Sequence, residues 1–327
     1  MKDNVLNWGL LSTAHINQAL IPPLNASKRN RLLAVASRSQ SSADDYARKW
    51  NIPRALGSYD ALIGDPEIDV IYNSLPNHLH AEWTIKALQS GKHVLCEKPF
   101  ALTLAEADAM ISASQKTGKV LAEAFMYRHH PQTLKIKELV DSGTLGDLQT
   151  VKGAFTFTLS RKGDIRTSKE TGGGSIWDVG CYPISYARMI MNAEPIEVFG
   201  WQVMGPGGTD DSFFGQLRFP NERYAQFDSG FKSPFRAQVE IVGAKGTLNI
   251  PQPFKPGLAE KIYLMRADRT ETVKIKGREL YIGEVEDIAD AVLLGKPPLI
   301  SLVDSRGNTA VILALIESAQ TGRPVHL

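Results

Sequence analysis

The sequence is poor in cysteine, with only Cys96 and Cys181 among its 327 residues. Each lies inside an apolar stretch, so we expect no disulfide framework, and a reducing cytoplasm fits this composition. No apolar run approaches the roughly 20 residues that span a bilayer. The N-terminal residues Met1–Asn4 lead into only a short apolar run without a cleavage site, so we expect no signal peptide.

Runs of like charge are also missing. Charged residues make up 22% of the chain, and the formal net charge is +2. This balance gives no support for binding to nucleic acid or to a membrane surface. What the chain does have is 43% hydrophobic residues over a length that predicts about two domains. We therefore expect a globular two-domain protein.

Strands and helices alternate over the first part of the chain. Apolar runs typical of buried strands are followed by stretches with helical spacing, and the helix 103–117 opens with the capping-box residues Thr103 and Glu106. Pro22–Pro23 is expected to end the first helix. This alternation predicts a doubly wound parallel sheet with helices on both faces. The expected strands are 5–11, 32–36, 70–73, 94–96 and 120–124, with helices at 14–24, 42–50, 78–90 and 103–117.

The second part of the chain is richer in strands. After a helix at 131–141, alternating segments punctuated by Gly, Pro and Asn predict a large, mostly antiparallel open sheet. A helix at 175–191 interrupts these strands, and helices at 284–294 and 304–321 end the chain. We place the boundary near residue 124, between domains 1–124 and 125–327. The expected strands are 148–159, 196–204, 212–219, 224–231, 236–242, 247–250, 262–265 and 270–275.

The first strand-to-helix turn lacks the glycines of a G-x-G-x-x-G dinucleotide fingerprint. It has Ser12, Ala14 and Asn17 in their place. Small and capping side chains still leave room for a pyrophosphate to approach the helix N-terminus. The alternative is an ordinary helix N-cap, and this turn alone does not decide between the two.

The second strand ends without an acidic residue. An NAD site usually has Asp or Glu here to bind the ribose 2′-hydroxyl. This chain has Ser37 and Arg38, a hydroxyl and a guanidinium that suit a 2′-phosphate. Given a dinucleotide fold, this indicates NADP rather than NAD, although a solvated loop arginine is the simpler alternative.

The segment Leu75-Pro76-Asn77-His78-Leu79-His80 follows a predicted strand, where parallel sheets bind ligands. We expect Asn77 to line a cofactor pocket and His78 or His80 to cap the next helix. No neighbouring Cys, Asp or Glu completes a metal-ligand pattern, so we predict no metal. A metal-dependent hydrolase or lyase that uses His78, His80, His129 and His130 is nevertheless an alternative.

The segment Cys96-Glu97-Lys98-Pro99 lies at the end of another predicted strand. An ammonium group there can polarise a carbonyl, favour an alkoxide and lower the pKa of a neighbouring hydroxyl. Pro99 favours an extended backbone at Lys98. The alternative is a surface salt bridge between Glu97 and Lys98.

A second group of polar residues follows the glycines at 172–174. Asp178 and Tyr182 are four residues apart, so they share one face of the predicted helix. A carboxylate and a phenol combined with the Lys98 ammonium form an acid–base set. The alternative is an acid that complements the helix dipole and an aromatic ring that packs in the core.

Together these segments resemble the glucose–fructose oxidoreductase/inositol dehydrogenase family, Gfo/Idh/MocA, over nearly the whole chain. Many members have His where this chain has Tyr182, so it looks like the branch with glucose–fructose oxidoreductase, dimeric dihydrodiol dehydrogenase and NADP-dependent xylose dehydrogenase. The segments that carry the resemblance are Ser12–Asn17, Ala36–Arg38, Pro76–His80, Glu97–Pro99, Glu123–Arg128 and Gly172–Tyr182.

The resemblance implies an N-terminal Rossmann domain and a C-terminal α+β domain that binds substrate and often forms a homodimer or homotetramer through its sheet. It implies that Lys98 and Tyr182 are the catalytic pair and that Asp178 assists them. The residues implied to contact substrate are Lys98, Arg166, Trp177, Asp178 and Tyr182. Those implied to contact the cofactor are Ser12, Thr13, Ala14, His15, Ile16, Ser37, Arg38, Leu75, Pro76, Asn77, His80, Glu97, Lys98, Pro99 and Arg128.

The expected activity is hydride transfer between NADP and a sugar-like or alicyclic alcohol or carbonyl compound. One alternative is an NADP-sensing protein without catalysis, against which the presence of Lys98, Asp178 and Tyr182 together argues. Another is a transhydrogenase that holds NADP tightly. The sequence does not identify the substrate.

Overall fold

The computed structural model describes residues 5–161, 163–267 and 269–327, so Met1–Asn4, on which the signal-peptide argument depends, lie outside it. The chain forms two compact units. The first comprises Met1–His129 and Tyr281–Arg306, and the second comprises His130–Leu280 and Gly307–Leu327. The single boundary expected near residue 124 therefore misses the return of the chain to the first unit.

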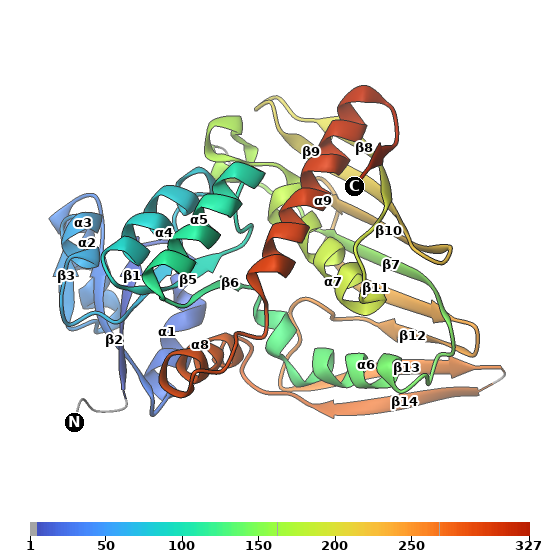
Figure 1. Ribbon diagram of the computed structural model, residues 1–327, viewed down its shortest axis with the longest axis horizontal. Coiled ribbons are helices and arrows are strands. Elements are labelled where there is room, and N and C mark those ends of the chain that lie inside the picture. The colour runs from blue at the N-terminus through green and yellow to red at the C-terminus, as the bar shows by residue number, and fades with distance from the viewer. Residues whose placement is uncertain (1–4, 162, 268) are drawn as a thin grey trace. The chain divides into compact units, whose positions relative to one another are not determined.

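The first unit contains a six-stranded parallel sheet with the order β3-β2-β1-β4-β5-β6 (Figure 1). This order confirms the doubly wound fold expected from the alternating pattern. The strand order reverses beside β1, and ligands of such sheets bind outside the carboxyl ends of the strands near that point. The strands are β1 Leu6–Leu11, β2 Asn30–Ala36, β3 Arg54–Leu56, β4 Val70–Asn73, β5 His93–Glu97 and β6 Leu121–Ala124.

Helices cover both faces of this sheet because successive strand residues point to opposite sides. Leu10 packs in the core formed with α1, α2 and α8, whereas Leu11 packs in the core formed with α3, α4 and α5. The helices are α1 Asn17–Ala26, α2 Gln40–Trp50, α3 Tyr59–Ile63, α4 His80–Gln89, α5 Leu104–Thr117 and α8 Ile282–Leu294.

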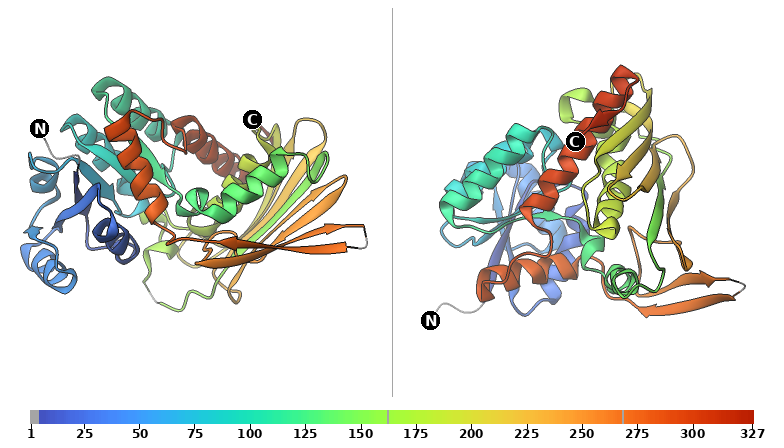
Figure 2. Two further views of the ribbon diagram at one scale, coloured as in Figure 1. Left: turned by 90° about the horizontal axis from the view of Figure 1, so that it is seen from below. Right: turned by 45° about the vertical axis from the view of Figure 1, so that its right-hand side comes forward.

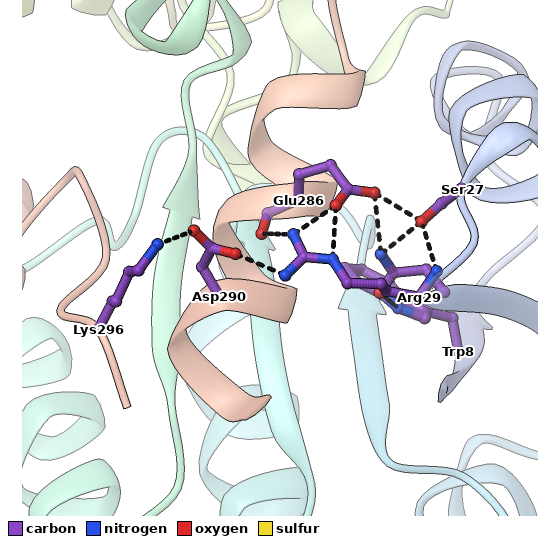
Figure 3. A network of polar contacts seen from close by, with 7 residues as sticks. Trp8, Ser27, Arg29, Glu286, Asp290 and Lys296 are labelled. Carbon is purple, nitrogen blue, oxygen red and sulfur yellow. Dashed lines mark hydrogen bonds and ion pairs between the residues drawn. The ribbon is translucent and has the colours of Figure 1, made fainter. Parts of the chain in front are cut away.

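Helix α8 is attached to the first unit by a polar network around Arg29 (Figure 3). The guanidinium of Arg29 donates to Glu286 at 2.9 Å through Nε and to Asp290 at 2.6 Å through Nη1. Ser27 Oγ donates to Glu286 at 2.5 Å, and Lys296 donates to Asp290 at 2.8 Å. These contacts and the apolar residues of α8 explain why Tyr281–Arg306 belongs with the Rossmann sheet.

The structure confirms the expected ends of α5 but not the expected end of α1. Thr103 and Glu106 form the predicted capping box, and Gly118 at φ 65° ends α5. The prediction that Pro22–Pro23 ends the first helix is wrong, because both prolines lie inside α1, which continues to Ala26. Each proline removes one helical N–H, and burial of Leu20, Ile21 and Leu24 in the core offsets that loss.

The second unit contains a nine-stranded sheet with the order β14-β13-β12-β11-β7-β10-β9-β8-β15. Most of its strands are the arrows coloured from green to orange in Figure 2. Neighbouring strands are antiparallel except for the parallel pair of β7 and β10, which confirms the mostly antiparallel sheet. The strands are β7 Leu148–Thr156, β8 Glu197–Met204, β9 Asp210–Phe219, β10 Arg223–Gly230, β11 Arg236–Gly243, β12 Gly246–Ile250, β13 Ala259–Arg266, β14 Arg269–Lys276 and β15 Val325–His326. Its helices are α6 Pro131–Asp141, α7 Cys181–Met191 and the part of α9 Leu302–Thr321 from residue 307 onward.

The two faces of the nine-stranded sheet differ. On one face, Phe155 of β7 packs against the ring of Tyr182 in α7 at 5.3 Å between centroids. The other face carries a hollow of about 720 Å³ lined by Trp201, Phe214, Asp228 and Arg236, among others. Trp201 is 53% exposed and Phe214 is 45% exposed, so this face is uncovered and partly apolar.

In the described part of the chain, no helix has the length and apolar character that a membrane crossing requires.

Candidate active site

The turn between β1 and α1 achieves a sharp bend without a glycine fingerprint. Ser12 has φ 132°, a conformation that glycine adopts far more readily than serine. Its hydroxyl contacts Ser74 Oγ at 2.9 Å and accepts from the Ala14 N–H at 3.1 Å, and Asn17 Nδ2 donates to the Ser12 carbonyl at 2.8 Å. The polar residues at this turn therefore stabilise the conformation that glycine usually supplies.

Helix α1 begins at Asn17, three residues later than expected. The residue before it, Ile16, has no side-chain cap, and the first turn of the helix carries no acid. Thr13, Ala14 and Ile16 are half-buried and His15 is exposed. The outer side of the turn therefore reaches solvent next to a helix N-terminus, an arrangement that fits a phosphate group.

At the end of β2, Ser37 and Arg38 have different surroundings. Ser37 is buried and its N–H donates to the Leu56 carbonyl at 3.0 Å. Arg38 is exposed, and within residues 5–161, 163–267 and 269–327 it forms no hydrogen bond or ion pair. Burial raises the pKa of Tyr59, and the nearby positive charge of Arg38 partly opposes that rise. The Arg38 guanidinium is thus available for an anion such as a 2′-phosphate.

The segment after β4 forms a short 3-10 helix, Asn77–Leu79, before α4 begins at His80. Pro76 and Asn77 are half-buried, Leu75 is buried and His78 is exposed. The prediction that His78 or His80 caps α4 is wrong, since the residue at the cap position is Leu79 and no side chain caps this end. The His80 ring instead lies 2.8 Å from two backbone carbonyls, those of Leu75 and Pro99.

The segment after β5 is fixed by buried carboxylates. Glu97 accepts a hydrogen bond from the Tyr72 hydroxyl and another from the Lys98 N–H at 3.2 Å. Glu123 accepts from the Phe100 N–H at 2.9 Å. The Lys98–Pro99 peptide bond is cis. Lys98 itself is half-buried at the carboxyl end of β5, which is where the sequence predicts it.

In the second unit, the glycines at 172–174 pack backbone against backbone. Gly174, at φ 124°, donates from its N–H to the Arg166 carbonyl at 2.8 Å. A Cβ atom on Gly173 would lie only 2.4 Å from the same carbonyl oxygen. The glycines thereby allow the segment that carries Arg166 to lie directly against the start of the next helix.

That helix does not begin as predicted. A π-helical turn, Ile176–Gly180, precedes α7, whereas a continuous α-helix was expected over 175–191. Asp210 Oδ2 accepts from Ser175 Oγ at 2.5 Å and from the Ile176 N–H at 3.0 Å. Burial raises the pKa of Asp210 to about 6. This acid, which the sequence analysis missed, anchors the π turn from strand β9, and π turns are common at functional sites.

Arg166 and Asp178, both expected to contact substrate, form an ion pair. Arg166 Nε donates to Asp178 Oδ2 at 2.8 Å, and Arg166 Nη1 lies 3.3 Å from Asp164 Oδ1. The charge of Asp178 is the main cause of the raised pKa of Arg166. The Arg166 side chain is 42% exposed and that of Asp178 is 15% exposed.

Tyr182 is 5% exposed, and its ring packs against Phe155 and Phe254 with centroid separations of 5.3 and 5.6 Å. Trp177, the remaining residue expected at the substrate, is 7% exposed. The structural alternative for Asp178 and Tyr182 thus describes part of their surroundings, because the phenol ring packs in a core and the carboxylate lies near the start of α7. Lys98 belongs to the first unit, and Asp178 and Tyr182 to the second.

The remaining candidates have structural partners. Arg128 Nη1 lies 3.0 Å from Asp304 Oδ2, and His129 Nε2 lies 3.2 Å from Asp287 Oδ2. His130 Nδ1 accepts from the Gln132 N–H at 3.1 Å and so caps α6. Across the described residues, no group of three or more His, Cys, Asp or Glu side chains is arranged to hold a metal ion.

Known proteins share the two-domain sequence pattern of this chain. The model of the oxidoreductase family with an NAD-binding Rossmann fold matches residues 6–125, and the GFO/IDH/MocA C-terminal domain matches residues 133–249. The chain is 35% identical to D-xylose 1-dehydrogenase (NADP(+)) 2 of Haloferax volcanii, over 98% of this chain and 99% of that protein. It is 33% identical to a trans-1,2-dihydrobenzene-1,2-diol dehydrogenase of Xenopus laevis, over 75% of this chain and 74% of that protein.

A solved structure has the same fold. It is a 3-ketoreductase from Actinomadura kijaniata in complex with NADP and TDP-benzene, with a TM-score of 0.91 and 27% identity. The match covers 96% of this chain and 98% of that structure. The chain therefore belongs to the Gfo/Idh/MocA family of oxidoreductases, as the order of its motifs predicts.

Proposed function

We propose that this protein is an NADP-preferring dehydrogenase or reductase that acts on a sugar-like or alicyclic alcohol or carbonyl compound. The observation that carries the proposal is Lys98, half-buried at the carboxyl end of β5 and held by the Glu97 side chain at its backbone N–H. The exposed guanidinium of Arg38 supports NADP over NAD, because it suits the extra phosphate. The names of the Haloferax relative and of the solved ketoreductase complex support the same cofactor.

The residues of the first unit fit a bound dinucleotide. The solvent-facing turn at 13–16 suits the pyrophosphate, Ser37 and Arg38 suit the 2′-phosphate, and Leu75–Asn77 suits the nicotinamide end. The other residues proposed to contact the cofactor are Glu97, Pro99 and Arg128. When bound, the nicotinamide supplies the hydride acceptor or donor.

The acid–base chemistry is assigned to this chain's own side chains. In the direction of oxidation, Tyr182 Oη accepts the proton of the substrate hydroxyl, and it returns that proton in the direction of reduction. The Lys98 ammonium stabilises the oxyanion that forms as the proton leaves. Asp178, oriented by Arg166 at 2.8 Å, accepts hydrogen bonds from further hydroxyls of the substrate. Arg166 and Trp177 complete the proposed substrate contacts.

The substrate class follows from these groups together with the relatives. A carboxylate that accepts hydrogen bonds beside a phenol suits a molecule with several hydroxyl groups. The relatives named above are a dehydrogenase of D-xylose and a dehydrogenase of a cyclic trans-diol. We therefore propose aldoses and cyclic diols as the first compounds to examine.

The main alternative is an NADP-binding sensor without catalysis. A sensor needs the cofactor residues but has no use for a buried phenol and an oriented carboxylate. The Arg166–Asp178 pair and the anchored π turn favour catalysis over this alternative, because they order side chains that a sensor does not require.

We also propose that the nine-stranded sheet forms a homodimer or homotetramer through its uncovered face. Trp201 and Phe214 expose large apolar surfaces there, and such patches commonly mark interfaces. Sedimentation velocity of the wild type and of Trp201→Glu tests this, and a monomeric wild type would contradict it. The cytoplasm is our proposed location, because both cysteines are buried thiols that form no disulfide with each other.

The activity is tested with purified protein by following NADPH absorbance. D-xylose, other aldoses and trans-cyclohexanediol are each offered with NADP and with NAD, and the Tyr182→Phe variant serves as the matched control. Turnover that prefers NADP and is lost in the variant supports the proposal. NADP binding without turnover of any compound, together with normal thermal stability, favours the sensor alternative.

A further inference from the structure

His80 joins two strand-end segments of the first unit through a single buried ring. It is the first residue of α4 and is only 1% exposed. Its Nδ1 lies 2.8 Å from the Pro99 carbonyl oxygen, and its Nε2 lies 2.8 Å from the Leu75 carbonyl oxygen. Leu75 follows β4 and Pro99 follows β5, so the imidazole connects the segments that carry Asn77 and Lys98.

The partners of the ring are both acceptors. A backbone carbonyl cannot donate, so each 2.8 Å contact is a hydrogen bond only when the facing nitrogen carries a proton. A neutral imidazole has one N–H and an imidazolium has two. Burial lowers the pKa of His80, the two carbonyl contacts oppose that effect, and the charge of Lys98 adds to it. The neutral ring therefore donates to one of the two carbonyls and packs against the other, and an amide side chain can retain one contact at a time.

The contact with Pro99 matters because it lies one residue beyond Lys98. The backbone here is fixed on three sides: Glu97 accepts from the Lys98 N–H at 3.2 Å, His80 binds the Pro99 carbonyl, and Glu123 accepts from the Phe100 N–H at 2.9 Å. These bonds determine the direction in which the Lys98 side chain leaves the end of β5.

We propose that His80 is a positioning residue, which holds Lys98 in a fixed relation to the Leu75–Asn77 segment. The inference rests on the proposed function, in which Lys98 acts on the substrate oxygen and Leu75–Asn77 lines the nicotinamide. The contact with Pro99 sets the position of the ammonium group and so affects the chemical step. The contact with Leu75 sets the cofactor-lining segment and so affects cofactor affinity.

Two substitutions separate these effects. An asparagine amide nitrogen takes the place of Nδ1, so His80→Asn keeps a donor facing Pro99 and loses the contact with Leu75. A glutamine amide nitrogen takes the place of Nε2, so His80→Gln keeps a donor facing Leu75 and loses the contact with Pro99. We expect His80→Asn to raise the KM for NADP by about 10-fold with a small loss in kcat. We expect His80→Gln to lower kcat by about 10²-fold with little change in that KM.

His93 provides the matched control, since it is a partly buried histidine at the start of β5, the end of that strand away from Lys98. Its Nδ1 accepts from the Val120 N–H at 2.9 Å. His93→Asn and His93→Gln are expected to change thermal stability without separating kcat from KM. The dissociation constant of NADPH is measured by the quench of tryptophan fluorescence, and we expect it to rank the variants in the same order as KM. This measurement does not depend on turnover.

Equal effects of the two His80 variants on kcat and KM would overturn the proposal, because a purely structural role cannot distinguish the two carbonyls. A second measurement uses the wild type and needs no variant to fold. In NMR spectra of protein labelled with ¹⁵N-histidine, we expect a ring N–H that exchanges slowly with water. The ¹⁵N chemical shift of this group should change on addition of NADPH. The lack of any such signal in protein that binds NADPH also overturns the proposal. A wild type with no NADP-linked turnover and no NADPH binding instead disproves the proposed function.

Discussion

The Asp178 carboxylate accepts a hydrogen bond from the Arg166 guanidinium, with 2.8 Å between Oδ2 and Nε. The same guanidinium lies 3.3 Å from Asp164, so one arginine contacts an acid before the π turn and an acid within it. Gly174 binds the carbonyl of Arg166 from the other side at 2.8 Å. Arg166 is therefore held through both its side chain and its backbone.

Loss of this pair should reduce activity more than stability. Arg166→Ala removes the guanidinium that binds Asp178, so we expect kcat/KM for the substrate to fall by about 10²-fold, with a smaller loss for Arg166→Lys. Steady-state kinetics check this. Arg218, 40% exposed and paired with Glu222, is the matched control, and Arg218→Ala should leave kcat/KM unchanged. Equal losses in the Arg166→Ala and Arg218→Ala variants would contradict the role of the pair.

Removal of the Tyr182 hydroxyl should affect proton transfer alone. Tyr182→Phe keeps the ring contacts with Phe155 and Phe254 and deletes the proposed acid–base group. We expect kcat to fall by about 10²–10⁴-fold while NADPH binding persists. Tyr186 lies one turn further along α7, is fully buried and packs on the same Phe254. Tyr186→Phe should retain turnover, and unchanged turnover in Tyr182→Phe would remove that residue from the mechanism.

The cofactor preference should depend on Arg38. Arg38→Ala removes a charge-assisted bond to the 2′-phosphate, so the dissociation constant for NADPH should rise about 10–100-fold while that for NADH changes little. Fluorescence titration measures both constants. Arg48, on the exposed surface of α2, provides the control, and Arg48→Ala should affect neither. If Arg38→Ala weakens the binding of NADPH and of NADH equally, the guanidinium does not bind the 2′-phosphate.

Asp210 should give the stability of the second unit a distinct dependence on pH. Its folded pKa of about 6 lies above its ordinary value of 3.8, so its contribution to stability is greatest below about pH 4 and is lost as pH rises through 6. Asp210→Asn lacks this ionisation but can still accept from Ser175 and Ile176. The stability of the variant relative to the wild type should therefore increase by about 2 kcal/mol between pH 4 and pH 7, because ionising the buried acid over this range costs that amount.

Urea unfolding at several pH values measures this difference. Comparing the two proteins at each pH cancels the other titrating groups that they share. A difference that stays constant between pH 4 and pH 7 would show that the acid titrates normally despite its burial.

Local signals in the sequence determine much of the fold. The helix at 131–141 matches α6 residue for residue, because Pro131 at its first position and apolar periodicity mark it clearly. The three-residue strand β3 and the five-residue helix α3 were missed, since such short elements show too few periods of apolar spacing. The membership of α8 in the first unit was missed for another reason. Its packing depends on Arg29, more than 250 residues earlier, and no local pattern records that contact.

In the candidate site, too, some residues have local sequence signals and others depend on contacts between distant parts of the chain. Lys98, Asp178 and Tyr182 are proposed from motifs that are short and ordered along the chain. Asp210 was missed because a buried acid at the start of a strand looks like a turn residue in sequence. His80 was assigned as a possible helix cap because its position before apolar residues suits a cap, whereas its partners, the carbonyls of Leu75 and Pro99, come from tertiary structure.

The most direct test of the account is the titration of the wild-type protein with NADPH and with NADH, followed by the quench of tryptophan fluorescence. The account predicts saturable binding of both, with NADPH tighter, because the free Arg38 guanidinium can bind the 2′-phosphate. Tighter binding of NADH would keep the oxidoreductase class and contradict the cofactor preference. No saturable binding of either nucleotide would contradict the account as a whole.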